Sequence, residues 1–261
     1  VLRLPFEGYM GPEFDTAAFA RKLFGDPSSG YEPPAAFIVE VVQGEGGLQA
    51  ASSEWIHAIA ALARDLGALF IVDDIQTGCG RTGTFFSFEP SGVVPDIVCV
   101  SKSISGVGLP MAINLIRPEF DVWEPGEHNG TFRGNNLAFV GARAALTYWE
   151  SDKFEAGIHS RTSAIRDALG RAAQAFPAGW ARVVGRGMLT GLRFDAAEYA
   201  ELMRTGLMRR GVIAETCGPH DEVLKLMPAL NIPMPLLLEG LDQTVAAANE
   251  LHHLLGQSKT A

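Results

Sequence analysis

Three residues of this 261-residue chain have the types and the spacing of a reactive site. Asp73 and Asp74 directly follow the apolar run 68–72, and Lys102 follows the apolar run 96–101. The carboxyl ends of parallel strands form the edge at which open α/β sheets bind ligands. A lysine held there among small residues is suited to act as a Schiff-base amine. A carboxylate on the neighbouring strand end is suited to pair with a pyridinium nitrogen.

Each of these residues also has an ordinary structural explanation. Asp73 and Asp74 are able to cap a turn, and a lone Lys102 is most simply a solvated strand end. The combination of an amine and a carboxylate at two neighbouring strand ends favours the chemical interpretation.

The elements that must position these residues follow the pattern of a parallel sheet. The short apolar segments 37–42 and 68–72 are typical of buried strands. Ser52 or Ser53 is expected to cap a helix whose apolar side chains recur at helical spacing over residues 55–66. A strand, a helix and a strand with short connections form a βαβ unit. Further buried strands at 96–101 and 111–116 are expected to continue the sheet.

The rest of the chain predicts a second, smaller domain. Its expected elements are helices from about 135 and over about 154–176, strands near 183–184 and 189–192, a helix around 202–207, a strand at 223–226 and a final helix over about 238–255. We therefore expect a large domain over residues 1–150 and a small C-terminal α+β domain over residues 151–261.

The segment 78–83 has the spacing G-x-G-x-x-G of a dinucleotide-binding turn. That turn must open a helix, whereas residues 84–90 are β-branched, aromatic and closed by proline. The context therefore excludes a dinucleotide site. Arg81 within the segment is expected to fix the loop by hydrogen bonds.

Composition excludes several other classes of function. The net charge of −9 and the lack of a basic run argue against nucleic acid as a partner. No uncharged run approaches the roughly 18 to 20 residues of a membrane span. Three cysteines without C-x-x-C spacing support neither a disulfide framework nor a zinc site, and the six histidines show no metal spacing. We expect a cytoplasmic protein without a metal.

Four ordered motifs resemble the class III aminotransferases of pyridoxal-phosphate fold type I. They lie at 38–47, 71–83, 95–97 and 101–102, and the stretch 123–136 resembles the subfamily that forms L-2,4-diaminobutyrate for ectoine biosynthesis. The resemblance implies an α/β fold with a mostly parallel large-domain sheet. It also implies a homodimer or a dimer of dimers.

The resemblance further implies how pyridoxal 5'-phosphate is bound. Lys102 would hold the cofactor covalently and shuttle a proton at the substrate carbon, and Asp73 would keep the ring nitrogen protonated. Gln76 would hydrogen-bond the phenolic oxygen of the ring. Thr131 would reach a cofactor phosphate, usually that of the neighbouring subunit.

Three further residues are expected to bind substrate. Glu45 matches a glutamate that in relatives pairs with an arginine and swings aside for dicarboxylic substrates, but the arginine position holds Lys225, which is a point donor rather than a planar fork. Arg133 either holds a substrate carboxylate or forms a surface salt bridge.

The implied reaction moves the amino group of L-glutamate to L-aspartate 4-semialdehyde, which gives L-2,4-diaminobutyrate and 2-oxoglutarate. Amino acids and 2-oxo acids are then the small-molecule partners. Another diamine or ω-amino acid transaminase, or a non-catalytic fragment that retains the fold, is the alternative. Family members begin with an N-terminal stretch that supplies part of the phosphate site, and the sequence lacks it. We expect either a portion of a longer protein or a fragment that has lost cofactor binding.

Overall fold

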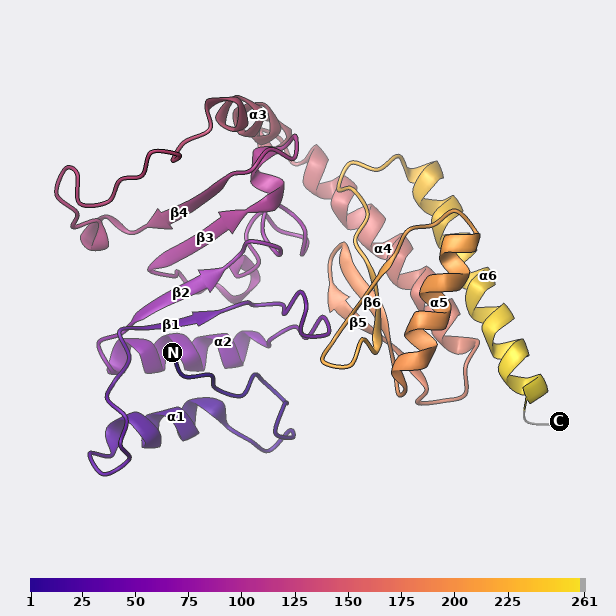
Figure 1. Ribbon diagram of the computed structural model, residues 1–261, viewed down its shortest axis with the longest axis horizontal. Coiled ribbons are helices and arrows are strands. Elements are labelled where there is room, and N and C mark those ends of the chain that lie inside the picture. Colours follow the sequence, from indigo (N-terminus) through magenta and orange to yellow (C-terminus); the bar gives the residue numbers. More distant parts are fainter. Residues whose placement is uncertain (259–261) are drawn as a thin grey trace. The chain divides into compact units, whose positions relative to one another are not determined.

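The computed structural model describes residues 1–258 and divides into two compact units (Figure 1). The first unit comprises residues 1–41, 51–79 and 86–147. The second comprises residues 42–50, 80–85 and the chain from 148 onward. Each unit is described by itself below.

The first unit contains a four-stranded sheet that carries the predicted βαβ unit. Its strands are β1 (Ala36–Val39), β2 (Leu69–Asp73), β3 (Ile97–Ser101) and β4 (Ala112–Ile116), in the order β1-β2-β3-β4. The first three are parallel, as the sequence predicts. The sheet therefore places the carboxyl ends of β2 and β3 side by side.

The strand β4 differs from the prediction for residues 111–116. It runs antiparallel to β3, because residues 102–111 are too few for the crossover that a parallel pair requires. The prediction of a buried strand is also wrong. Ala112, Asn114 and Leu115 are exposed, because β4 is the last strand of the described sheet and has a neighbour on one side alone.

Helices of the first unit begin at well-formed caps. Helix α2 (Ser53–Asp65) begins after Ser52, whose Oγ accepts a hydrogen bond from the Trp55 amide at 3.1 Å, and it packs on β1 and β2. Helix α1 (Thr16–Gly25), which was not predicted, packs on α2. Helix α3 (Asn136–Leu146) begins at the predicted place, after Asn135.

Short 3-10 helices complete the connections. They are η1 (Glu89–Ser91), η2 (Lys102–Ser105), η3 (Pro118–Phe120) and η4 (Thr147–Trp149).

The second unit packs three helices on a four-stranded antiparallel sheet. The strands β5 (Ala181–Arg186), β6 (Leu189–Phe194), β7 (Glu215–Cys217) and β8 (Val223–Leu226) follow the order β5-β6-β8-β7. The helices are α4 (Lys153–Gln174), α5 (Ala197–Arg209) and α6 (Met234–Ser258), and α6 packs against both α4 and α5 (Figure 1). All of these elements except β7 match predicted ones.

The core of the second unit lies between these helices and the sheet. Fully buried apolar side chains come from both layers, and they include Ile165, Leu169, Leu192, Met203 and Leu224. No helix within residues 1–258 has both the length and the apolar character that crossing a membrane requires.

Candidate active site

The candidate site begins where β2 and β3 end. Asp73, the last residue of β2, is the parallel partner of Cys99, and the Asp74 amide donates a 2.9 Å hydrogen bond to the Cys99 carbonyl. Lys102 follows the last residue of β3. The sheet thus brings a carboxylate and an amine to two adjacent strand ends, as the spacing predicts.

Asp73 has one oxygen anchored and one available. Its Oδ1 accepts a 3.0 Å hydrogen bond from the Ile75 amide, and Oδ2 makes no hydrogen bond to residues 1–258. The side chain is half-buried. Burial raises the pKa of the adjacent Cys99 thiol, and the negative charge of Asp73 raises it further. The fixed carboxylate therefore has a free oxygen that can accept a hydrogen bond from a protonated ring nitrogen.

Lys102 is held in an unusual backbone conformation. Its φ is +50°, in the left-handed region that a residue with a side chain rarely adopts. Ser105 Oγ donates to the Lys102 carbonyl at 3.3 Å, and Ser101 Oγ donates to the Met111 carbonyl at 2.6 Å. The ammonium is exposed and has no ion-pair partner among the residues that the structure describes. Backbone contacts therefore position an amine that is free to react.

Asp74 stabilises the turn that follows Asp73. It is fully buried, its Oδ1 accepts a 2.7 Å hydrogen bond from Thr77 Oγ1, and its Oδ2 accepts a 2.9 Å hydrogen bond from the Ser87 amide. Gln76, the predicted partner of the phenolic oxygen, lies half-buried on this turn. Asp73, Gln76 and Lys102 thus belong to one unit and to the ends of adjacent strands.

Thr131 and Arg133 lie apart from the strand ends along the chain, on the exposed loop between η3 and α3. Arg133 Nη1 donates to the His128 carbonyl at 3.3 Å, and the His128 ring stacks on Trp123 with centroids 5.4 Å apart. Arg133 forms no salt bridge with residues 1–258, so the surface ion pair weighed from the sequence is not formed in the described part of the chain.

Glu45 and Lys225 form an ion pair within the second unit. Glu45 Oε1 lies 2.8 Å from Lys225 Nζ, although the two residues are separated by 180 positions. Glu215 Oε2 is a second partner, 3.2 Å from the same Nζ. Glu215 was not predicted, because it lies on β7, and the three residues of this strand are too few to form an apolar pattern.

The glycine-rich segment 80–85 serves the structure of the second unit. Arg81 is buried, and its Nη1 donates to the carbonyls of Met188 at 3.2 Å and Pro228 at 2.6 Å. The Met188 amide in turn donates to the Arg81 carbonyl at 2.9 Å. Burial lowers the pKa of Arg81 to about 10. These bonds confirm that Arg81 fixes the loop, and the segment forms turns rather than a helix.

Replacing Arg81 by alanine is expected to destabilise the protein by about 2–4 kcal/mol. The change leaves the Met188 and Pro228 carbonyls without this donor and opens a cavity, although relief of the buried charge offsets part of the loss. Chemical denaturation measures the effect. The matched control is Arg204→Ala on α5, whose solvent-screened pair with Glu201 is expected to contribute far less to stability. Equal effects of the two changes would contradict the structural role of Arg81.

Gly187 is the residue against which the glycine-rich segment packs. It has φ +63°, and a Cβ there would overlap the Thr82 carbonyl carbon. Gly187→Ala is therefore expected to cost more than about 3 kcal/mol, beyond the roughly 1–2 kcal/mol of the left-handed backbone alone. Gly211→Ala, at φ +79° with no atom within 4 Å of the added Cβ, measures the backbone cost by itself. Thermal unfolding of both variants gives the difference, and no difference would exclude the close approach.

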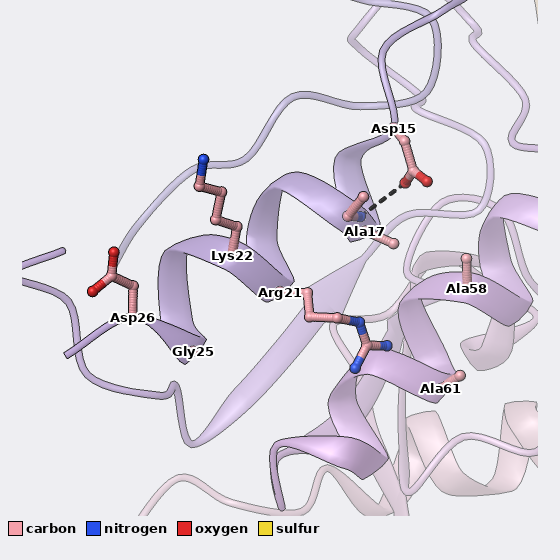
Figure 2. A pocket seen from close by; sticks show the side chains of 9 residues that line it. Asp15, Ala17, Arg21, Lys22, Gly25, Asp26, Ala58 and Ala61 are labelled. Carbon is pink, nitrogen blue, oxygen red and sulfur yellow. Dashed lines mark hydrogen bonds between the residues drawn. The ribbon is translucent and has the colours of Figure 1, made fainter. Parts of the chain in front are cut away.

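A groove between α1 and α2 contains none of the predicted site residues. Figure 2 shows Asp15, Arg21, Lys22 and Asp26 around it, with small side chains between them. Arg21 is paired with Asp65 of α2 at 2.8 Å. The groove is therefore a surface feature of the helical layer, and the candidate site remains at the strand ends.

The fold and the strand-end residues define an α/β protein whose site suits pyridoxal phosphate. An amine suits its aldehyde carbon, and a carboxylate with a free oxygen suits its protonated ring nitrogen. A model of the family described as aminotransferase class III matches residues 21–247. The chain belongs to the class III aminotransferases, which are pyridoxal-phosphate-dependent enzymes.

Curated relatives are similar over most of this chain. The diaminobutyrate–2-oxoglutarate transaminase of Bordetella parapertussis is 52% identical over 241 residues, which are 92% of this chain and 55% of the relative. That of Halalkalibacterium halodurans is 46% identical over 259 residues, which are 99% of this chain and 60% of the relative. The chain thus spans little more than half the length of these relatives.

Solved structures confirm the fold-type-I prediction. The ornithine aminotransferase of Toxoplasma gondii matches with a TM-score of 0.80 and 28% identity, over 92% of this chain and 56% of that one. The N-acetylornithine aminotransferase of Stenotrophomonas maltophilia matches with a TM-score of 0.76 and 30% identity, over 91% of this chain and 61% of that one.

Proposed function

We propose that the whole protein transfers the amino group of L-glutamate to L-aspartate 4-semialdehyde. The products are L-2,4-diaminobutyrate and 2-oxoglutarate, and the reaction supplies ectoine biosynthesis. The observation that carries the proposal is the placement of Asp73 and Lys102 at the ends of adjacent parallel strands in a chain of this family. The names of the relatives that are 46% and 52% identical support this choice of substrates.

Asp73 and Lys102 have complementary roles in this reaction. Bound pyridoxal phosphate supplies a ring that draws electrons from the substrate's α-carbon. Lys102 Nζ would anchor the cofactor and would carry a proton from the substrate carbon to the cofactor in the first half of the cycle, and in the opposite direction in the second half. The free Oδ2 of Asp73 would accept a hydrogen bond from the protonated ring nitrogen and would keep the proton there. Gln76 would bind the phenolic oxygen, and Thr131 would bind a cofactor phosphate.

Glu45, Arg133 and Lys225 select the substrate. Lys225 receives the distal carboxylate of glutamate once the Glu45 side chain turns away, and Glu45 covers Lys225 when the semialdehyde substrate is bound. Arg133 binds a carboxylate from the exposed loop. The active form is a homodimer or a dimer of dimers in the cytoplasm, where the free thiols of Cys79, Cys99 and Cys217 remain reduced.

A comparison of two semialdehydes tests the choice of substrate. The full-length protein, loaded with cofactor and supplied with L-glutamate, is assayed with L-aspartate 4-semialdehyde and with L-glutamate 5-semialdehyde. We expect kcat/KM to favour the four-carbon aldehyde by at least about tenfold, because one methylene in a fitted pocket changes selectivity by roughly 10–200-fold. A preference for the five-carbon aldehyde would instead indicate another ω-amino acid transaminase. No turnover with either would support the non-catalytic alternative.

A further inference from the structure

Lys225 is held by two carboxylates from two different elements. Its Nζ lies 2.8 Å from Glu45 Oε1 and 3.2 Å from Glu215 Oε2, and its own side chain is 2% exposed. Two carboxylates around one ammonium give this cluster a formal charge of −1. One carboxylate is enough to neutralise the ammonium, so the presence of the second carboxylate needs an explanation of its own.

The two carboxylates differ in how the fold holds them. Glu215 lies on β7 directly opposite Lys225 of β8, so strand pairing keeps it beside the ammonium. Glu45 lies in the segment 42–50, which turns back through the isolated bridge between Val42 and Ala50. Both carboxylate side chains are largely exposed, Glu45 at 71% and Glu215 at 66%, so the difference lies in the backbone, which is a paired strand at Glu215 and a turn at Glu45. Glu45 is therefore the displaceable partner, and Glu215 is the fixed one.

A lysine responds to the loss of a partner differently from an arginine. Arginine stays charged in proteins, whereas a buried lysine readily loses its proton. Burial acts to lower the pKa of Lys225, but the hydrogen bonds and charges of Glu45 and Glu215 outweigh it and raise the pKa. When Glu45 turns away, Glu215 is the carboxylate that still opposes the effect of burial.

Other groups around Lys225 do not substitute for Glu215. The strand β6 places the uncharged Gly191 opposite Lys225, and Arg193 on β6 is paired with Glu222 at 3.0 Å. Burial raises the pKa of Cys217 on β7 to about 11, so this thiol stays neutral below that pH. Among residues 1–258, no third acidic side chain lies within ion-pair distance of Lys225.

We propose that Glu215 is a positioning residue, a fixed counter-ion that keeps the Lys225 ammonium charged while a substrate carboxylate replaces Glu45. The inference rests on the proposed function, in which Lys225 receives the distal carboxylate of a dicarboxylic substrate. Exchange of the Glu45 carboxylate for that of the substrate leaves the charge of the cluster unchanged. The buried lysine is then never left without a partner, even though the family resemblance implies an arginine at this position.

The kinetic test varies 2-oxoglutarate with diaminobutyrate as the amino donor, since 2-oxoglutarate has no amine that titrates. In the full-length holoenzyme of the Glu215→Gln variant, the KM for 2-oxoglutarate is expected to rise by at least about tenfold as the pH increases from 7 to 9.5. A shift of one pKa unit changes the charged fraction of a lysine about tenfold. The sign follows because the pKa of Lys225 falls in this variant, so the ammonium is lost as pH rises. The wild-type KM is expected to stay constant over this range, and kcat to be unchanged by the substitution.

Replacement of Lys225 by arginine in the Glu215→Gln variant distinguishes a positioning role of Glu215 from a general structural effect. In Glu215→Gln combined with Lys225→Arg, the KM is expected to lose its pH dependence, because arginine remains charged without a fixed counter-ion. The matched control is Glu201→Gln, an exposed glutamate on α5 that pairs with Arg204. A Glu215→Gln profile equal to that of the wild type, or a profile that arginine does not flatten, would overturn the inference.

A direct titration of Lys225 does not depend on turnover. Carbon-13 NMR of ε-labelled lysine, with the Lys225 signal identified by its absence from Lys225→Ala, compares Glu45→Gln with Glu45→Gln/Glu215→Gln in the full-length protein. The double variant is expected to lose the Lys225 proton at least one pH unit lower than the single variant. Identical titrations would refute the role of Glu215. A wild-type protein that does not transaminate 2-oxoglutarate would contradict the proposed function alone, and the NMR comparison would still decide the inference.

Discussion

Lys102→Ala is expected to lower kcat by about 10⁴-fold or more in the full-length protein. The variant loses both the covalent anchor of the cofactor and the base that moves the substrate proton, and each role alone contributes orders of magnitude. The position of Lys102 beyond β3, with a free and exposed ammonium, motivates the prediction. A single-turnover assay with L-glutamate measures the effect.

Chemical labelling tests the same assignment independently of rate. Borohydride treatment of the wild-type holoprotein is expected to fix a pyridoxyl group on the peptide that contains Lys102, and no stable label is expected in Lys102→Ala. Lys153→Ala on α4 is the matched control, because Lys153 has no role in the proposed site. A label found on a peptide without Lys102 would remove this residue from the mechanism.

Asp73→Asn is expected to reduce kcat by about 10²–10⁴-fold while the protein remains folded. The amide retains an oxygen for the Ile75 N–H, but a neutral group cannot hold the ring nitrogen protonated. The absorbance of the bound cofactor and the rate of the glutamate half-reaction measure the loss. An Asp73→Asn variant with nearly wild-type turnover would show that this carboxylate is not the partner of the ring nitrogen.

Asp74→Asn is the matched control, and it is expected to behave in the opposite way. Both oxygens of the buried Asp74 accept hydrogen bonds, from Thr77 Oγ1 and the Ser87 amide, so an asparagine turns one acceptor into a donor. We expect a loss of stability of about 1–3 kcal/mol, with kcat reduced far less than in Asp73→Asn. The comparison of the two variants thus distinguishes the chemical role of Asp73 from the structural role of Asp74.

Local apolar patterns predicted the elements that carry Asp73 and Lys102, because the residues within each element define its type and its bounds. Short continuous apolar runs located β2 and β3, and the spacing of apolar residues located α2 within one residue of its observed end. The direction of β4 depends on the length of the preceding connection, which the apolar pattern does not describe. The exposure of β4 depends on its place in the sheet order, which no local window contains.

Local apolar patterns could not predict the contacts between residues that are far apart in the sequence. Glu45 and Lys225 were paired through family resemblance alone, and 180 positions separate them. Glu215 was not predicted, because β7 contains only three residues and a periodic pattern needs more. The pairing of β7 with β8 is a tertiary contact, which a local pattern does not describe. The structure, and not the sequence, therefore identified Glu215 as the fixed carboxylate of the cluster.

The chain passes between its two compact units after residues 41, 50, 79, 85 and 147. Neither unit is one continuous stretch of gene, so recombination at a single point cannot exchange either unit as a module. During synthesis, Glu45 and Arg81 leave the ribosome long before Lys225 and Pro228, the residues to which they bind. The second unit therefore completes its fold late, when the last strand closes on two segments made more than a hundred residues earlier.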